Sequence, residues 1–184
     1  MPAAPSLRKL QAMLDDTVLG KSEPSTRAIL APGQIPSHRW ISFGGEVLAL
    51  SIDLGEGRYP TPTEIHKFHN IVKLYAPYTK TCMISVTLPN YVYDVPKSDH
   101  GRIFLNLVSI LNEFTRVARL EVITRMPFEN FTQLINASHF YRLDFKDWKL
   151  FLKVGSEDLE QIHVGSTIES RLNDWYKVNI AGVP

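Results

Sequence analysis

The sequence predicts an α/β fold with a mixed, largely parallel sheet. Helical crossovers connect its strands in the order β-α-β-α-β-α-β-β-α, behind a flexible N-terminal tail. The main observation is that short runs of strand length alternate with longer segments whose apolar residues recur at helical spacing. In addition, two of these longer segments open with capping-box residues. A chain of 184 residues is the usual size of one domain, which we place at residues 38–184.

Residues 1–37 differ from the rest of the chain in composition. Prolines and small polar residues interrupt this segment repeatedly, which predicts a tail without a packed structure of its own. Apolar residues at helical spacing within residues 6–19 also indicate a short amphipathic helix. That helix could dock on the domain or on a partner.

The first half of the domain contains two predicted strands and the helix between them. Residues 47–52 are apolar on both faces, which is typical of a central strand covered on both sides. The helix begins at Thr61, which can act as the N-cap, while Pro62 suits the first helical position and Glu64 completes a capping box. The second strand, at residues 81–88, alternates between residues for a core face and a second face.

The second half continues the same alternation. A helix is expected from residue 98 or 99 to about residue 114, then a strand at residues 119–124 and a helix after Pro127. Residues 141–145 and 148–154 are predicted to form two strands. The second strand has one buried face and one face that is partly exposed to solvent. A capping box formed by Ser166 and Glu169 opens the last helix.

Bulk composition excludes several classes of protein. Lys and Arg number 20 against 19 Asp and Glu, so the chain lacks the basic excess typical of nucleic-acid binders. No apolar run is long enough for a membrane span or a secretory signal. Cys82 is the only cysteine, which excludes an intramolecular disulfide and a thiolate zinc cluster. We expect a cytoplasmic or nuclear protein that binds neither nucleic acid nor membrane.

No motif in the sequence assigns a catalytic residue, a metal or a cofactor. His66 and His69 could approach one metal ion, but no third ligand follows at a diagnostic spacing. Asp99 beside His100 could form an acid–base pair or an anion site at a helix start, although Asp99 is more simply the cap. The turn at residues 55–57 lacks the third glycine of a dinucleotide-binding fingerprint and the Gly-Lys-Ser/Thr of a phosphate-binding P-loop.

A loop rich in aromatic residues is the strongest candidate for a binding surface. Residues 89–97 contain Tyr91 and Tyr93 between prolines, and such amphipathic rings are enriched at protein interfaces. The rings could instead pack over the edge of the sheet. We predict partner binding through this loop, together with nearby tyrosine and helix residues. The predicted partner-binding residues are Tyr78, Tyr91, Tyr93, His100 and Arg102.

Two stretches of the second half resemble a known kind of repeat. Residues 116–122 read Arg-Val-Ala-Arg-Leu-Glu-Val, and residues 140–145, after a helix, read Phe-Tyr-Arg-Leu-Asp-Phe. This pattern resembles the leucine-rich-repeat-like regions of F-box-type proteins and of uncharacterised fungal proteins, in layout across residues 45–180. The segment from Thr63 to Val72 lacks the Leu-Pro opening of an F-box, so no ligase-adaptor role is carried over. The resemblance implies binding in preference to catalysis.

Three functional hypotheses follow from the sequence. The first is a non-enzymatic protein-interaction module that uses the aromatic loop and the adjacent helix surface. The second is a small α/β enzyme of unknown reaction, with a His/Asp site at the carboxyl ends of the strands. Its candidate residues are Asp53, His66, Asp99 and His100. The third is self-association, in which residues 148–154 act as an edge strand that pairs across a two-fold axis.

Overall fold

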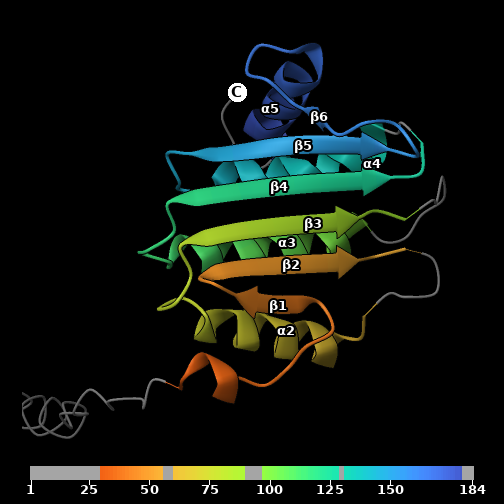
Figure 1. The fold of residues 1–184 in the computed structure, drawn as a ribbon. Helices are drawn as coiled ribbons and strands as arrows, with labels where there is room; N and C mark the ends of the chain where they lie inside the picture. The colour runs from red at the N-terminus through yellow and green to blue at the C-terminus, as the bar shows by residue number, and fades with distance from the viewer. Residues whose placement is uncertain (1–29, 56–59, 90–96, 129–130, 180–184) are drawn as a thin grey trace, which may run out of the picture.

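The computed structural model describes residues 30–55, 60–89, 97–128 and 131–179. Within these residues six strands form one sheet in chain order, β1-β2-β3-β4-β5-β6 (Figure 1). The central four strands are parallel, and the two outer strands pair antiparallel at the edges. The predicted fold class, a mixed and largely parallel sheet with helical crossovers, is confirmed. The strands are β1 (Ile41–Gly44), β2 (Val47–Asp53), β3 (Thr81–Thr87), β4 (Arg119–Met126), β5 (Trp148–Val154) and β6 (Glu160–Gln161).

The crossovers between the parallel strands are helical and lie on one side of the sheet. Because each strand is added next to the preceding one in the same direction, right-handed crossovers place every connecting helix against the same face. Figure 1 looks onto the opposite face, with α3 and α4 passing behind the strands. The helical elements are η1 (Pro32–Gln34), α2 (Pro62–Leu74), α3 (Lys97–Asn112), α4 (Phe131–Leu134), η2 (Ile135–Arg142) and α5 (Thr167–Asn179), where η denotes a 3₁₀ helix.

The hydrophobic core lies between the sheet and these helices. Every second residue of β2, β3 and β4 is buried there, as the period of two along a strand requires, and Leu150 and Leu152 of β5 are buried as well. Phe68 of α2, Phe104 of α3 and Phe140 of η2 fill the helix side and are fully buried. The strand residues of the core include Leu48, Leu50, Ile52, Cys82, Ile84, Val86, Leu120, Val122, Leu150 and Leu152.

The other face of the sheet, which we call the open face, is not covered by any helix of the described residues (Figure 1). In β2, Ser51 is exposed and Ala49 is only partly buried. The prediction that residues 47–52 are covered on both sides is therefore wrong. The outward residues of this strand are small, and small residues do not distinguish a covered face from an uncovered one.

The predicted strand at residues 141–145 is also wrong. The 3₁₀ helix η2 continues to Arg142, and the N–H of Leu143 donates to the carbonyl of Phe140 at 3.0 Å. Phe140 and Leu143 both point into the core, which a 3₁₀ turn achieves at a spacing of three. The last strand of the sheet is instead the two-residue β6, which the sequence pattern did not reveal.

Strand β1 forms a tight hairpin with β2. Gly44 pairs with Val47, so only Gly45 and Glu46 form the loop, and both have positive φ, of 56° and 66°. Positive φ at both central residues is the geometry that matches the twist of a two-residue hairpin, and glycine adopts it at little cost.

The capping box predicted at the start of α2 forms in full, and the one predicted at the start of α5 forms in part. Thr61 Oγ1 accepts the N–H of Glu64 at 3.3 Å, while the Glu64 carboxylate accepts the N–H of Thr61 at 2.9 Å, so this capping box is confirmed. At α5, Ser166 Oγ accepts the N–H of Glu169, but the Glu169 carboxylate accepts from Gly165 instead of Ser166.

The hypothesis that residues 148–154 form an edge strand is wrong. β5 pairs with β4 over its whole length, and β6 covers Phe151 and Leu152 on its other side.

The predicted N-terminal helix at residues 6–19 lies outside the described residues. Ile35, just before the expected start of the domain, is already buried in the core. None of the helices in the described ranges is long and apolar enough to cross a membrane.

Candidate functional site

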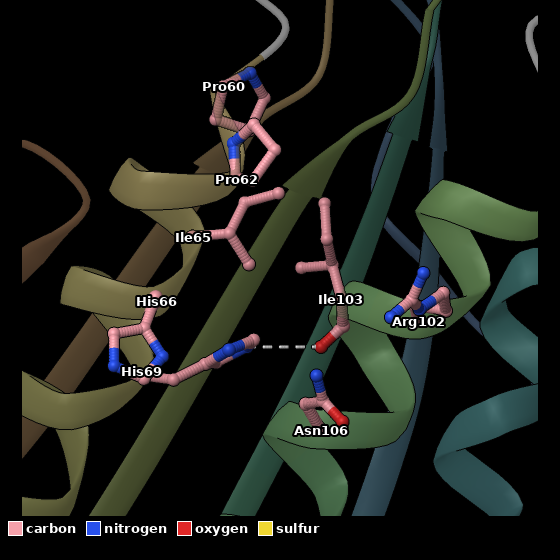
Figure 2. Close-up of a pocket in the computed structure, with 8 residues that line it drawn as sticks. All are labelled: Pro60, Pro62, Ile65, His66, His69, Arg102, Ile103 and Asn106. Carbon is pink, nitrogen blue, oxygen red and sulfur yellow. Dashed lines mark hydrogen bonds between the residues drawn. The ribbon is translucent and has the colours of Figure 1, made fainter.

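A cavity of about 280 Å³ opens between the first halves of α2 and α3, on the helix side of the sheet (Figure 2). It combines apolar walls with imidazole, guanidinium and amide groups. Its lining residues are Pro60, Pro62, Ile65, His66, His69, Arg102, Ile103 and Asn106. Because α2 and α3 follow neighbouring parallel strands, their first turns lie at the same end of the sheet, and the cavity opens there.

The two histidines of this cavity have different environments. His69 is only 7% exposed, and burial lowers its pKa to about 4, so its ring is neutral at pH 7. Its Nε2 lies 3.3 Å from the carbonyl oxygen of Ile103, which only accepts, so the ring proton is assigned to Nε2. His66 is exposed, and its Nε2 lies 2.9 Å from the side-chain amide of Asn70. Both rings therefore already have partners within the helices.

The described residues contain no group of three His, Cys, Asp or Glu side chains that could hold a metal ion. His66 and His69 line the same cavity, as their spacing on one helix predicts, but no third ligand of this kind joins them.

The predicted partner-binding residues are only partly described. Arg102 is exposed at the α2–α3 cavity. His100 belongs to the first turns of α3, but its side chain lies outside the described part of the molecule, as do Tyr91 and Tyr93 entirely. The aromatic loop therefore stays a prediction.

Tyr78 lies away from Arg102. It follows the carboxyl end of α2, whereas Arg102 faces the first half of that helix, which is roughly 20 Å long. The hydroxyl of Tyr78 donates to the carbonyl of Leu30 at 2.8 Å. This tyrosine therefore holds the segment that enters the domain.

The candidate residues for a small enzyme do not come together where their side chains are described. Asp53 lies on the open face at the end of β2, where its carboxylate accepts the N–H of Gly55 at 3.0 Å. His66 lies on α2, on the opposite side of the sheet. The side chains of Asp99 and His100 are not described. The structure therefore gives the proposed His/Asp site no shared pocket for Asp53 and His66.

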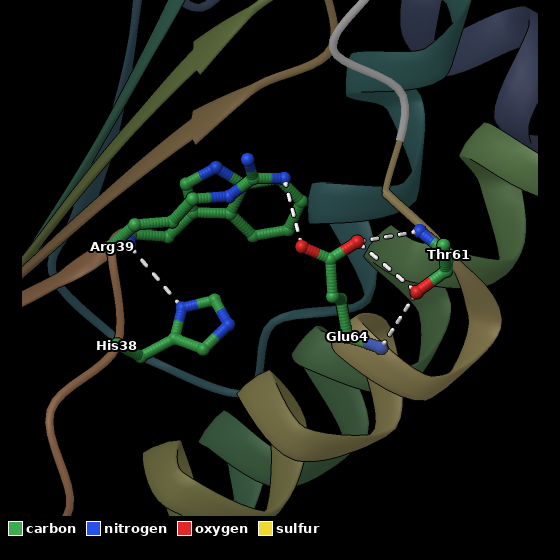
Figure 3. A network of polar contacts seen from close by, with 5 residues as sticks. His38, Arg39, Thr61 and Glu64 are labelled. Atoms are coloured by element: carbon green, nitrogen blue, oxygen red, sulfur yellow. Dashed lines mark hydrogen bonds and ion pairs between the residues drawn. The ribbon is translucent and has the colours of Figure 1, made fainter.

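A polar network joins the segment before β1 to the start of α2 (Figure 3). The Arg39 guanidinium lies 5.4 Å from the centre of the Trp40 ring and 3.4 Å from the Glu64 carboxylate. His38 Nδ1 accepts the N–H of Trp40 at 3.2 Å, and burial lowers the pKa of His38, helped by the nearby positive charge of Arg39. Each group has a structural partner, so the network fixes the β1–α2 contact.

The open face carries a second candidate surface, which the sequence did not single out. Ile123 and Phe151 are direct cross-strand neighbours near its centre, and Ser85 and Ser51 extend the same row. Met83, in the adjacent row, is 39% exposed, which is unusual for a large apolar side chain in a central strand. The alternation of residues 81–88 and 148–154 did reveal a second face. Only the arrangement of the crossovers shows that this face is uncovered.

Cationic residues surround this apolar centre. Lys149, Arg125 and Lys153 point to the open face, and none of them belongs to an ion pair between described residues. Arg119, at the other end of the face, pairs with Glu121. The open face thus combines an apolar centre with a predominantly basic border.

Comparison with known proteins found no significant similarity. The chain matches no protein-family model, and searches of curated proteins and of solved structures gave no significant match.

Proposed function

We propose that this protein is a non-enzymatic protein-interaction module of the cytoplasm or nucleus that binds a protein partner on the open face of its sheet. The observation that carries this proposal is the uncovered apolar centre formed by Met83, Ile123 and Phe151. Met and aromatic side chains are enriched at the centres of protein interfaces, whereas polar and charged groups dominate the rim.

Charge indicates the kind of partner. Lys149 lies opposite Glu121 in the register, whereas Arg125 and Lys153 form no ion pair with a described residue. We therefore expect a complementary surface to carry carboxylates beside an apolar patch. Such complementarity raises the rate of association and selects against basic partners.

The predicted aromatic loop connects β3 to α3 in the chain, and its tyrosines lie outside the described residues. Partner binding by Tyr91 and Tyr93 remains part of the proposal. Arg102 belongs to the α2–α3 cavity, where it would form a separate contact on the helix side.

The resemblance to leucine-rich-repeat-like regions supports the same proposal. In such repeats a strand and a helix alternate, the strands lie in chain order, and the sheet face forms an extended binding surface. Strands β2 to β5 have that order here, with their helices on one side. The alternative of a small enzyme has less support, because Asp53 and His66 lie on opposite sides of the sheet.

Site-specific photo-crosslinking in cells tests this function. A photoreactive amino acid replaces Ile123 on the open face or, as the matched control, the exposed Lys73 on α2. We expect a discrete protein adduct from position 123, and not from position 73, that disappears when Met83→Glu is added. An adduct of twice the chain mass identifies a second copy as the partner. Equal adducts from both positions, or none from position 123, contradict the proposal.

A further inference from the structure

A second cavity, of about 310 Å³, lies at the carboxyl ends of the parallel strands. The ends of β3, β4 and β5 contribute Thr87, Arg125 and Lys153 to its wall. The rest of the wall is apolar or glycine: Gly55, Leu88, Met126, Pro127 and Gly155. None of these residues belongs to the predicted partner-binding set. The cavity is separate from the α2–α3 cavity, which lies on the helix side.

Sheet register places the two cations next to each other. Thr87 pairs with Arg125, and Arg125 pairs with Lys153, so the three side chains leave adjacent strands on the same face. Neighbouring strands are about 4.8 Å apart. Neither cation forms an ion pair with a described residue. A bound anion would neutralise this positive charge.

The guanidinium of Arg125 has a fixed orientation. Its Nε donates to Ser85 Oγ at 2.9 Å, which holds the planar group across β3. The two terminal nitrogens are not used in that hydrogen bond, and they form the fork that recognises phosphate or carboxylate oxygens. Asp53, the carboxylate in the same row, is separated from Arg125 by the Thr87 strand and accepts the N–H of Gly55.

The wall behind the cations is closely packed. Gly155 has φ of 50°, and its N–H donates to the carbonyl of Met126 at 2.8 Å, which joins the ends of β4 and β5. A β-carbon at Gly155 would lie 3.0 Å from the carbonyl oxygen of Pro127. Glycine is therefore required for both the backbone angle and the close approach.

We propose that this cavity binds the phosphate group of a phosphate monoester. The Arg125 fork, the Lys153 ammonium and the Thr87 hydroxyl offer donors from three adjacent strands, and a monoester has three terminal oxygens to accept them, whereas a carboxylate has two. Two positive side chains also match a group that carries about −1.5 to −2 at pH 7. The monoester belongs to either a small metabolite or a phosphorylated side chain, and both present the same chemistry. This site does not depend on the proposed use of the apolar centre.

Titration of the full chain with phenyl phosphate, followed by amide NMR shifts at constant ionic strength, tests the site. We expect saturable binding with the largest shifts at Gly155 and Lys153. Arg125→Gln should weaken binding by about tenfold or more, since one bidentate contact is lost. Arg125→Lys should weaken it less, because it keeps the charge without the fork. Lys149→Gln, on the same face of β5 but four residues before Lys153, is the matched control.

Further titrations distinguish the sources of the phosphate. Stronger binding of a phosphoserine peptide than of glucose 6-phosphate identifies a phosphorylated partner, and the reverse order identifies a metabolite. The unphosphorylated peptide and acetate should not compete. The proposal is overturned if phenyl phosphate does not saturate, if acetate competes equally, or if Lys149→Gln weakens binding as much as Arg125→Gln.

Discussion

Gly101 of α3 lies directly against the imidazole of His139 in η2, and a β-carbon at position 101 would be 2.9 Å from the ring Nε2. His139 is held in a largely buried position: its Nδ1 is buried without a hydrogen-bond partner among the described residues, and burial lowers its pKa. The absence of a side chain at position 101 therefore sets how closely α3 and η2 approach.

Gly101→Ala should destabilise the protein by about 1–3 kcal/mol, because the methyl group overpacks a contact that cannot easily relax. Helix propensity alone would favour alanine by about 1 kcal/mol, so the sign of the change shows which effect is larger. Urea denaturation measures it. Ser109→Ala, exposed on the same helix, is the control and should be neutral or slightly stabilising. Adding His139→Ala to Gly101→Ala should cost less than the two single changes combined. Strict additivity would contradict the contact.

The stability of the protein should rise with pH between about 4 and 6.5, in part because of His69. Its pKa in the folded state is about 4, below the ordinary value of 6.5, since burial disfavours the charged ring. In this range the unfolded chain binds a proton that the folded protein does not, so acidification favours unfolding. The contribution is up to about 3 kcal/mol, present in full above pH 6.5 and lost as the pH falls to 4.

Comparison of two histidine variants isolates that contribution. Free energies of unfolding from urea titrations should depend less on pH in His69→Gln than in the native protein. His38 and His139, whose pKa values are also lowered, leave a residual slope of the same sign. His163→Gln, at an exposed position, should keep the native slope. If both variants show the same slope, His69 is not the titrating group.

Cys82 should not react with thiol reagents while the protein is folded. The side chain is buried in the central strand β3, and burial raises its pKa to about 12, so the reactive thiolate is almost absent at pH 8. An aromatic disulfide reagent should titrate one thiol in denaturant and react with the native protein only as fast as β3 becomes exposed. A Ser109→Cys variant supplies an exposed thiol for reference. Native Cys82 labelled as rapidly as that thiol would contradict its burial.

Thr61→Ala should destabilise the protein by about 1 kcal/mol, because it removes the N-cap acceptor of α2 and the partner of Glu64. Thr63→Ala, at the exposed second residue of the helix, is the matched control and should have little effect. Thr61→Ser keeps the hydroxyl and should retain most of the native stability. Thermal and urea denaturation measure all three variants. Equal losses for Thr61→Ala and Thr61→Ser would show that the methyl group, and not the cap, matters at this position.

Local sequence patterns determined most of the secondary structure. The capping box at Thr61, the alternation at residues 81–88 and the helical spacing at residues 98–114 each depend on contacts within a few residues, and each predicted element is present. The short strands β1 and β6 and the 3₁₀ helix η2 escaped prediction, because their conformation depends on the strands and the core that they pack against.

The candidate sites depended much more on tertiary structure. The sequence by itself determined that one face of the strands is apolar and the other mixed, because side chains alternate along a strand whatever its neighbours are. Only the order of the strands and the shared side of the crossovers decided that the mixed face is left open. Only the register brought Arg125 and Lys153 together from segments nearly thirty residues apart. Such proximity arises from long-range pairing, for which neither segment carries a local signal.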